Sequence, residues 1–190
     1  MVRGTLIFCS VVSMLTSMQA AQKNTDVAFK TVSKKVSLGQ YVPQDIITFN
    51  RVKMSKRIVP DLKKLLEAAK KDGIELKVMS GYRSYEYQDA LFKKYVRSEM
   101  KKNPCLSPQQ AEAKVNIFSA QPGHSEHQLG TVVDVLSVEN KFQFSSDPTL
   151  AYVGWLEKHA PRYNFKISYP KDSPEYIYEP WHIRWYPSAK

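Results

Sequence analysis

The spacing of apolar positions predicts a helix followed by a strand in the first half of the chain. Leucine and alanine recur at helical intervals over residues 60–71, with a proline at the start and Gly73 just past the end. Over residues 74–79 apolar and polar side chains alternate, which is typical of a strand. This strand leads directly into Ser80-Gly81-Tyr82-Arg83, so Arg83 is expected at a strand-to-helix junction.

Two serines mark the starts of two further predicted helices. Ser84 can cap a helix of about residues 84–102, and Ser107, followed by Pro108 in the first turn, can start a helix that ends near residue 118. The first of these helices carries three large side chains on one face. They are Tyr87, Leu91 and Tyr95.

The second half of the chain predicts short strands around one more helix. The β-branched run 131–136 is typical of a buried strand, and Asp147-Pro148 starts a helix that ends near His159. Short strands are expected at residues 165–168, 176–178 and 182–186. This order predicts a single α+β domain, in which helices pack on a small, largely antiparallel sheet.

The N-terminus has the order of a secretory signal peptide. Arg3 precedes an apolar run over residues 6–15, which is too short to span a bilayer, and a small-residue segment follows. We predict a signal peptide over residues 1–20, an extended leader over 21–40 and the functional domain over 41–190. Export to the periplasm, cell wall or medium follows, and a retained membrane anchor is the alternative.

The chain of 190 residues is strongly basic, with a formal charge of +10 and a pI near 9.5. Removal of residues 1–20 takes away Arg3 and no acid, so +10 falls to +9. Such a charge favours an anionic partner, which includes wall polymers. The basic residues are dispersed and no recognition motif is present, so nucleic acid is not expected. Cys105 is then the only thiol, which excludes an intramolecular disulfide.

Candidate metal ligands come from two separated stretches, PGHSEHQLGTVVD at residues 122–134 and EPWHIR at residues 179–184. His127, Asp134 and His182 provide the three ligands that a catalytic zinc takes while it keeps one position for water. Asp134 lies in a valine-rich strand, where a carboxylate needs a metal or an arginine such as Arg184 as its partner. The strand alone leaves these two alternatives open.

The remaining histidines and Glu179 are less specific signals. Glu179 and His182 can reach one site only if the chain turns between them, because residues three apart on a regular strand face opposite sides. His124 is expected not to bind the metal, since a fourth protein ligand would close the site. His159 is expected to be a helix-terminal or core histidine.

Three motifs in order resemble the LAS metallopeptidases, in particular the D-alanyl-D-alanine carboxypeptidases of the vancomycin-resistance and L,D-carboxypeptidase type. The motifs are S-x-H-x-x-G-x-x-x-D from Ser125 to Asp134, E-P-W-H-x-R from Glu179 to Arg184, and S-G-Y-R-S-x-x-x-Q from Ser80 to Gln88. The resemblance covers residues 41–186. Val132 and Trp185-Tyr186-Pro187 depart from the family pattern, which affects the shape of subsites rather than the metal ligands.

The resemblance implies one Zn²⁺ per chain on His127, Asp134 and His182, with Glu179 as general base. It further implies that Arg83 pairs with the terminal carboxylate of a peptide, while Gln88 and Ser125 hydrogen-bond the substrate. Trp181 is expected to form a wall of the site, and Arg184, two residues from His182, is expected to support its anionic groups.

The implied function is removal of the C-terminal D-Ala from peptidoglycan stem peptides, by a D,D- or L,D-carboxypeptidase that is expected to be a monomer. Anionic wall polymers are expected as further partners of the basic surface. One alternative is a wall endopeptidase, which has less use for Arg83 as a carboxylate clamp. Another is a zinc-bearing wall-binding module without turnover, against which the presence of Glu179 argues.

Overall fold

The computed structural model describes residues 31–173 and 175–186, which belong to one compact unit, Thr31–Lys190. The predicted signal peptide and the first part of the predicted leader lie outside the described residues. Among the described residues, no helix combines the length and the apolar character needed to cross a membrane.

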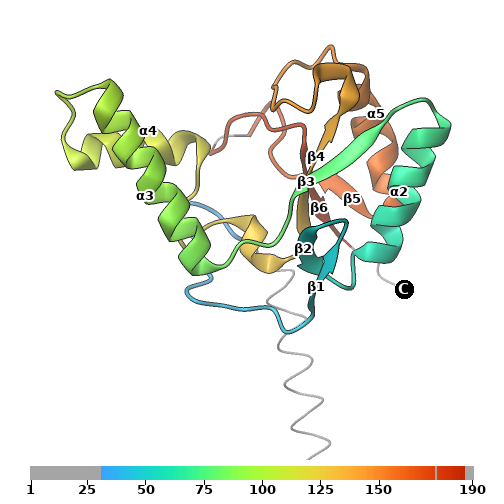
Figure 1. Cartoon of the computed structure of the whole chain (residues 1–190), viewed down its shortest axis with the longest axis horizontal. Coiled ribbons are helices and arrows are strands. Elements are labelled where there is room, and N and C mark those ends of the chain that lie inside the picture. The colour runs from blue at the N-terminus through green and yellow to red at the C-terminus, as the bar shows by residue number, and fades with distance from the viewer. Residues whose placement is uncertain (1–30, 174, 187–190) are drawn as a thin grey trace, which may run out of the picture. The chain divides into compact units, whose positions relative to one another are not determined.

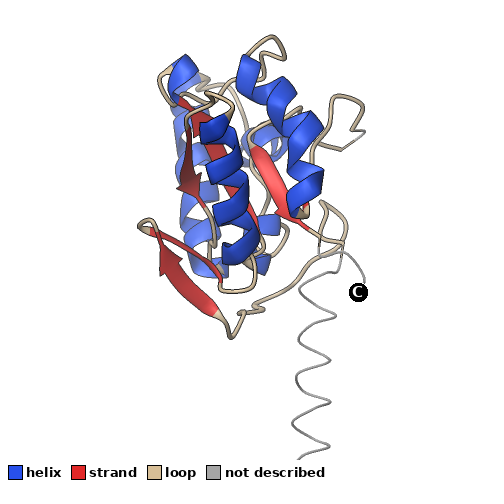
Figure 2. Ribbon diagram, turned by 90° about the vertical axis from the view of Figure 1, so that its right-hand side faces the viewer, coloured by secondary structure: helices blue, strands red, loops and turns tan. Residues whose placement is uncertain are grey.

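Four α-helices and six strands make up the regular structure of the described residues, together with three short 3₁₀ helices (Figures 1 and 2). Most of the elements follow the order predicted from the sequence. They are β1 (Ile46–Phe49), β2 (Val52–Ser55), α2 (Val59–Lys71), β3 (Leu76–Ser80), α3 (Tyr85–Lys102), α4 (Pro108–Phe118), η1 (Glu126–Leu129), β4 (Val132–Ser137), η2 (Val138–Asn140), α5 (Ala151–His159), η3 (Ala160–Tyr163), β5 (Phe165–Ile167) and β6 (His182–Trp185).

The main sheet has the order β3-β4-β6-β5, and every neighbouring pair is antiparallel. This confirms the predicted α+β class with a small antiparallel sheet. The register pairs Asp134 with Ser80 on one side and with His182 on the other. Directly paired residues of antiparallel strands project from the same face. One row across three strands therefore brings together side chains that lie far apart in the sequence.

The apolar core lies between the sheet and the helices α2 and α5, which flank it on the side away from α3 and α4 (Figure 1). Leu62, Leu65 and Ala69 of α2 are fully buried, as the predicted helical spacing requires. All six residues of β4 are buried, so this strand is covered on both faces. The core fixes β4 and β6, and these strands carry the polar row on their other face.

The helix α3 packs through a face other than the one that carries Tyr87, Leu91 and Tyr95. Gln88 and Phe92 are its buried residues, whereas Tyr87 is 60% exposed and Tyr95 36% exposed. The reason is that α3 packs against α4 rather than against the sheet. Large aromatic residues on several faces of a helix do not identify the buried face.

The caps of α3 and α4 were predicted correctly: Ser84 accepts a hydrogen bond from the Tyr87 amide, and Ser107 forms a capping box with Gln110.

Two boundaries in the C-terminal half also differ from the predictions. The helix α5 begins at Ala151 rather than at residue 147, because the Asp147 carboxylate accepts hydrogen bonds from Thr149 in a turn that precedes the helix. Residues 176–178 do not form a strand. The ring of Tyr176 stacks instead on Tyr169 at a centroid distance of 4.2 Å, and this packing orders the segment without sheet pairing.

The hairpin β1–β2 was not predicted. Its turn consists of Asn50 and Arg51, both with positive φ, as a two-residue hairpin turn requires. Asn50 between alternating apolar residues was the available signal, but arginine is uncommon at the second position. The hairpin supports the junction after β3: the Tyr82 amide donates to the Lys53 carbonyl at 2.6 Å, and a side chain at Gly81 would collide with that carbonyl.

The described part of the predicted leader packs on the loop that leads into η1. Val32 is buried, and the Leu38 amide donates to the carbonyl of Gly123 at 2.8 Å. The amide group of Gln128 donates to the carbonyls of Gly39 and Tyr41. Residues 31–41 therefore hold the loop that carries the predicted metal ligand His127.

Candidate active site

Three predicted metal ligands meet at the row across β3, β4 and β6. The Nε2 atom of His127 lies 3.3 Å from Oδ2 of Asp134, and Nδ1 of His182 lies 3.2 Å from Oδ1 of Asp134. All three side chains are buried, with at most 4% of each exposed. The structure therefore brings together residues that the sequence separates by up to 55 positions.

His127 is held by the backbone of the β3–α3 junction. It lies on η1, and its Nδ1 atom is 2.7 Å from the carbonyl oxygen of Gly81. A carbonyl only accepts hydrogen bonds, so Nδ1 carries the proton and the lone pair of Nε2 points towards Asp134. The orientation of this ring thus depends on the close packing of Gly81 against the β1–β2 hairpin.

His182 is held on its edge and on its face. Its Nε2 atom lies 3.0 Å from Oε2 of Glu126, and its ring stacks on Tyr169 with a centroid distance of 4.4 Å and an interplanar angle of 14°. Glu126 is itself buried and accepts from Arg184 at 2.6 Å. The Nδ1 atom is the one that faces Asp134 and His127.

The arrangement fits a tetrahedral metal ion. One ligand atom from each of His127, Asp134 and His182 can be chosen so that all lie within 4.8 Å of one another. Each histidine approaches a different oxygen of Asp134, with Nε2 of His127 at 3.3 Å from Oδ2 and Nδ1 of His182 at 3.2 Å from Oδ1, and two histidines with one carboxylate form a ligand set typical of zinc. The second nitrogen of each histidine is engaged by an acceptor of the protein, a common feature of metal-binding histidines.

The other two histidines lie outside this cluster. The Nδ1 atom of His124 is 2.9 Å from the carbonyl of Ser33, so this residue fastens the N-terminal segment to the loop. His159 ends α5 and stacks on Trp155 with an interplanar angle of 2°. The position of His159 confirms the prediction of a helix-terminal histidine.

The charges of the cluster are strongly coupled. Burial acts to raise the pKa of Asp134, but its contacts with His127 and His182 hold that pKa well below the usual value. Burial acts to lower the pKa of His182, yet hydrogen bonds to Asp134 and Glu126 raise it to about 9. Burial and the charge of Arg83 lower the pKa of His127 to about 4. These shifts favour the ionised form of Asp134, the neutral form of His127 and the protonated form of His182.

Glu179 stands beside this cluster because the chain turns. The His182 amide donates to the Glu179 carbonyl at 3.0 Å, which closes the turn that the E-x-x-H spacing required. Its Oε2 atom lies 3.9 Å from Nδ1 of His182. Burial, with a smaller contribution from the charge of Asp134, raises the pKa of Glu179 to about 7. A carboxylate with this pKa can accept and return a proton near neutral pH.

The arginine partner of Asp134 is Arg83 rather than Arg184. Nη2 of Arg83 lies 3.1 Å from Oδ2 of Asp134, and the guanidinium also donates to Ser80. Its side chain is 23% exposed, so it is both anchored and accessible from the cleft. Arg184 pairs with a different carboxylate, that of Glu126, at 2.6 Å.

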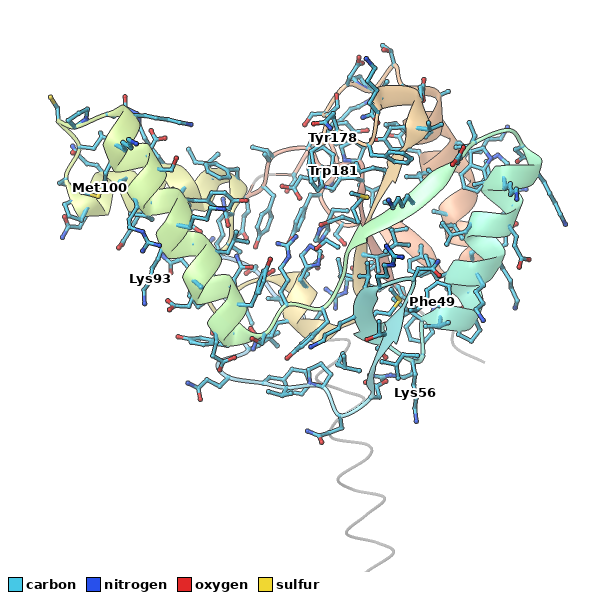
Figure 3. All side chains as sticks on the ribbon, viewed as in Figure 1. Phe49, Lys56, Lys93, Met100, Tyr178 and Trp181 are labelled. Atoms are coloured by element: carbon cyan, nitrogen blue, oxygen red, sulfur yellow. The ribbon has the colours of Figure 1, made fainter. Side chains whose placement is uncertain are left out.

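The predicted substrate-binding residues and Trp181 line one cleft of about 210 Å³ with the cluster and Glu179. Gln88 is buried, and its amide nitrogen donates to the Ala120 carbonyl at 2.7 Å, which joins α3 to the segment after α4. Ser125 is buried next to η1. Trp181, labelled in Figure 3, packs its edge on Phe144 with a centroid distance of 5.2 Å. Trp181 therefore lines the cleft.

Glu126 and Tyr169 are the functional candidates that the sequence did not reveal. Glu126 lies between the motif residues Ser125 and His127. The only sequence signal for its role was a charged residue between two residues of the proposed site. Tyr169 lies in the segment between β5 and β6, where only the fold shows that its ring covers His182.

A buried His-Asp-His cluster beside a carboxylate in a cleft defines the class of site found in zinc peptidases. The family model for VanY, D-alanyl-D-alanine carboxypeptidase, matches residues 51–188. The chain belongs to this family.

Individual relatives agree with this assignment. YodJ from Bacillus subtilis (strain 168) is 34% identical over 179 residues, which cover 86% of this chain and 61% of YodJ. The D-alanyl-D-alanine carboxypeptidase of Enterococcus faecalis (strain ATCC 700802 / V583) is 35% identical over 72% of this chain and 49% of its own length. The chain thus spans about half to three-fifths of these relatives.

Solved structures share the fold. The vancomycin resistance D,D-pentapeptidase VanY from a VanB-type cassette, solved as a mutant in complex with Zn(II), has a TM-score of 0.69 at 29% identity, with 84% of this chain and 88% of that chain covered. VanYB in complex with D-alanine-D-alanine gives 0.70 at 29% identity, over 83% and 86%. The LdcB LD-carboxypeptidase gives 0.67 at 34% identity, over 81% and 74%.

Proposed function

We propose that this protein is a zinc carboxypeptidase that removes the C-terminal D-Ala from peptidoglycan stem peptides. The observation that carries the proposal is the position of Glu179, 3.9 Å from His182 at the edge of the buried His-Asp-His cluster. Relatives with this fold are described in complex with Zn(II), in complex with D-alanine-D-alanine and as an LD-carboxypeptidase.

His127, Asp134 and His182 would hold the zinc ion. When bound there, zinc supplies Lewis-acid chemistry, because it lowers the pKa of water and polarises a carbonyl oxygen. Glu179 accepts a proton from the attacking water and returns it to the leaving amine. Its location on a tight turn, partly shielded from solvent, keeps the carboxylate poised for both steps.

Arg83 binds the free carboxylate at the end of the peptide. Its guanidinium is anchored by Ser80 and Asp134 and still reaches the cleft, and a planar fork can donate two parallel hydrogen bonds to a carboxylate. Ser125 and Gln88 line the same cleft and would hydrogen-bond the peptide. A charged clamp at the terminus favours a carboxypeptidase over an endopeptidase, which has no terminal carboxylate to bind.

The test is incubation of the purified protein with pentapeptide and tetrapeptide muropeptides, followed by mass spectrometry. We expect loss of one alanine in the presence of zinc, no loss after chelation, and no loss with Glu179→Gln. Cleavage of the pentapeptide assigns D,D activity, and cleavage of the tetrapeptide assigns L,D activity. A zinc-loaded protein that binds these peptides and releases no amino acid would instead be a wall-binding module.

We further propose that the protein acts outside the cytoplasm, because its N-terminal sequence has the order of a signal peptide and its substrate lies in the wall. The basic surface would then help it stay near anionic wall polymers. Fractionation of cells that express the full chain tests this proposal, and recovery of the unprocessed protein in the cytoplasm would contradict it.

A further inference from the structure

A second buried carboxylate lies behind the proposed zinc site. Glu126 is 5% exposed, and each of its oxygens faces a different donor: Oε2 is 3.0 Å from Nε2 of His182, and Oε1 is 2.6 Å from Nη1 of Arg184. Glu126 is not one of the three residues whose ligand atoms converge on the metal position. Burial of a carboxylate is costly, so its retention at this place calls for a reason.

The contact with Glu126 favours the tautomer of His182 that a metal on Nδ1 requires, whereas without a metal both ring nitrogens face a carboxylate, Nε2 that of Glu126 and Nδ1 that of Asp134. A neutral imidazole carries a single proton, and an ionised carboxylate only accepts hydrogen bonds. With the proton on Nε2, His182 donates to Glu126 and the lone pair of Nδ1 faces Asp134. With the proton on Nδ1, the lone pair of Nε2 would face a carboxylate oxygen at 3.0 Å and the ligand atom would be blocked.

Arg184 determines which oxygen of Glu126 is available to His182. The two residues are two positions apart on β6, so they project from the same face of the strand towards η1. Because Arg184 binds Oε1, only Oε2 is left for the histidine. Tyr169 then stacks on the His182 ring, and Tyr176 stacks on Tyr169, so rotation of the ring is restricted as well.

We propose that Glu126 and Arg184 are positioning residues that present Nδ1 of His182 to the metal. This inference rests on the proposed function in that it assumes a zinc ion on His127, Asp134 and His182. The two ligand histidines are then oriented by different devices. His127 relies on a backbone carbonyl, whereas His182 relies on a buried ion pair.

The substitution Glu126→Gln tests this role with little change in shape. The carbonyl oxygen of the new amide is drawn to Arg184, so its NH₂ group faces Nε2 of His182 and favours the wrong tautomer. We expect zinc affinity, measured by competition with a chromophoric chelator, to fall about 10–100-fold. The double variant Glu126→Gln with Arg184→Met frees the amide to turn its oxygen towards His182, so part of the affinity should return.

The controls separate this inference from the proposed function. Glu157→Gln, which alters an exposed carboxylate bonded to Tyr178, should leave zinc affinity unchanged. Thermal unfolding of each variant in the presence of chelator verifies that the fold is intact. Unchanged zinc affinity in a folded Glu126→Gln protein, or a double variant that binds no better than the single one, overturns the positioning role. Failure of the wild-type protein to bind zinc overturns the proposed function itself.

Discussion

The two walls of the cleft differ in how firmly their side chains are held. On the sheet side, Asp134 and His182 are each 2% exposed, and each contacts at least two partners. On the opposite side, which is formed by the helices α3 and α4, Ile117 and Phe118 are 54% and 48% exposed. In Figure 3, Trp181 lies beside the sheet, and Lys93 and Met100 mark the course of α3.

We expect this difference to separate metal binding and proton transfer on the sheet side from substrate recognition on the side of α3 and α4. Metal ligands and a proton-transfer group must be held within a fraction of an ångström, and the buried row across β3, β4 and β6 achieves this through paired strands. The side formed by α3 and α4 carries Tyr95 and Phe118, whose rings form an edge-to-face pair with a centroid distance of 5.5 Å. These two helices make far fewer contacts with the sheet. Substitutions on the two walls should therefore have effects of different kinds.

The largest effect is expected from Glu179→Gln. The amide keeps the shape of the side chain but cannot accept the proton of the attacking water, so kcat should fall by roughly 10²–10⁴-fold. Zinc content, measured on the same sample by atomic absorption, should stay at one per chain. Full activity in a zinc-loaded variant would exclude Glu179 as the base.

Asp134→Asn should remove both metal binding and a part of the stability. It leaves Arg83 and the two histidines without their shared anion, and the loss of one partner of a buried pair costs about 3–5 kcal/mol. Urea unfolding in chelator measures this change, and Asp89→Asn is the matched control. The Asp89–Lys93 pair is exposed, so its loss should cost at most ~1 kcal/mol. Equal losses in the two variants would contradict the contrast between buried and exposed carboxylates.

The decrease of the unfolding free energy at acidic pH should depend on Glu126. Burial acts to raise its pKa, but the hydrogen bond from His182 and the charges of His182 and Arg184 lower it to about 2, from 4.5 in the unfolded chain. A lowered pKa stabilises the fold above pH 4.5, and this contribution is lost as the pH falls towards 2. In chelator, the unfolding free energy of wild type should decrease over that range, and that of Glu126→Gln should decrease less. Parallel curves would contradict this assignment.

Arg83→Lys tests the carboxylate clamp. An ammonium cannot form the two parallel hydrogen bonds of a guanidinium, so KM for a free peptide should rise roughly 10-fold while kcat changes little. A substrate with an amidated C-terminus is the control, because wild type and variant should then cleave it equally poorly. A variant that loses kcat instead would place the function of Arg83 at Asp134.

The sequence indicated the ligands but not their supports. Residue types made His127, Asp134 and His182 candidates, and the resemblance to the family selected them as a ligand set. The caps at Ser84 and Ser107 follow from local hydrogen bonding. Glu126 and Tyr169 could not be found in this way, because their contacts with His182 depend on the register of β4 with β6 and on the course of the chain before residue 179. The buried face of α3 was missed for a related reason, since tertiary contacts with α4 select it.

The smallest effect is expected from substitutions in the wall formed by α3 and α4. Phe118→Ala removes one half of the Tyr95–Phe118 pair, which contributes about 0.5–1.5 kcal/mol, and it opens the cleft without touching the cluster. Zinc affinity should not change, whereas KM for muropeptides should rise a few-fold. Tyr87→Ala, on the same helix pair but outside the cleft, is the control and should leave KM unaltered. If Phe118→Ala lowered zinc affinity as Asp134→Asn does, the two walls would not be energetically separate, and recognition and metal binding would have to be treated as one unit.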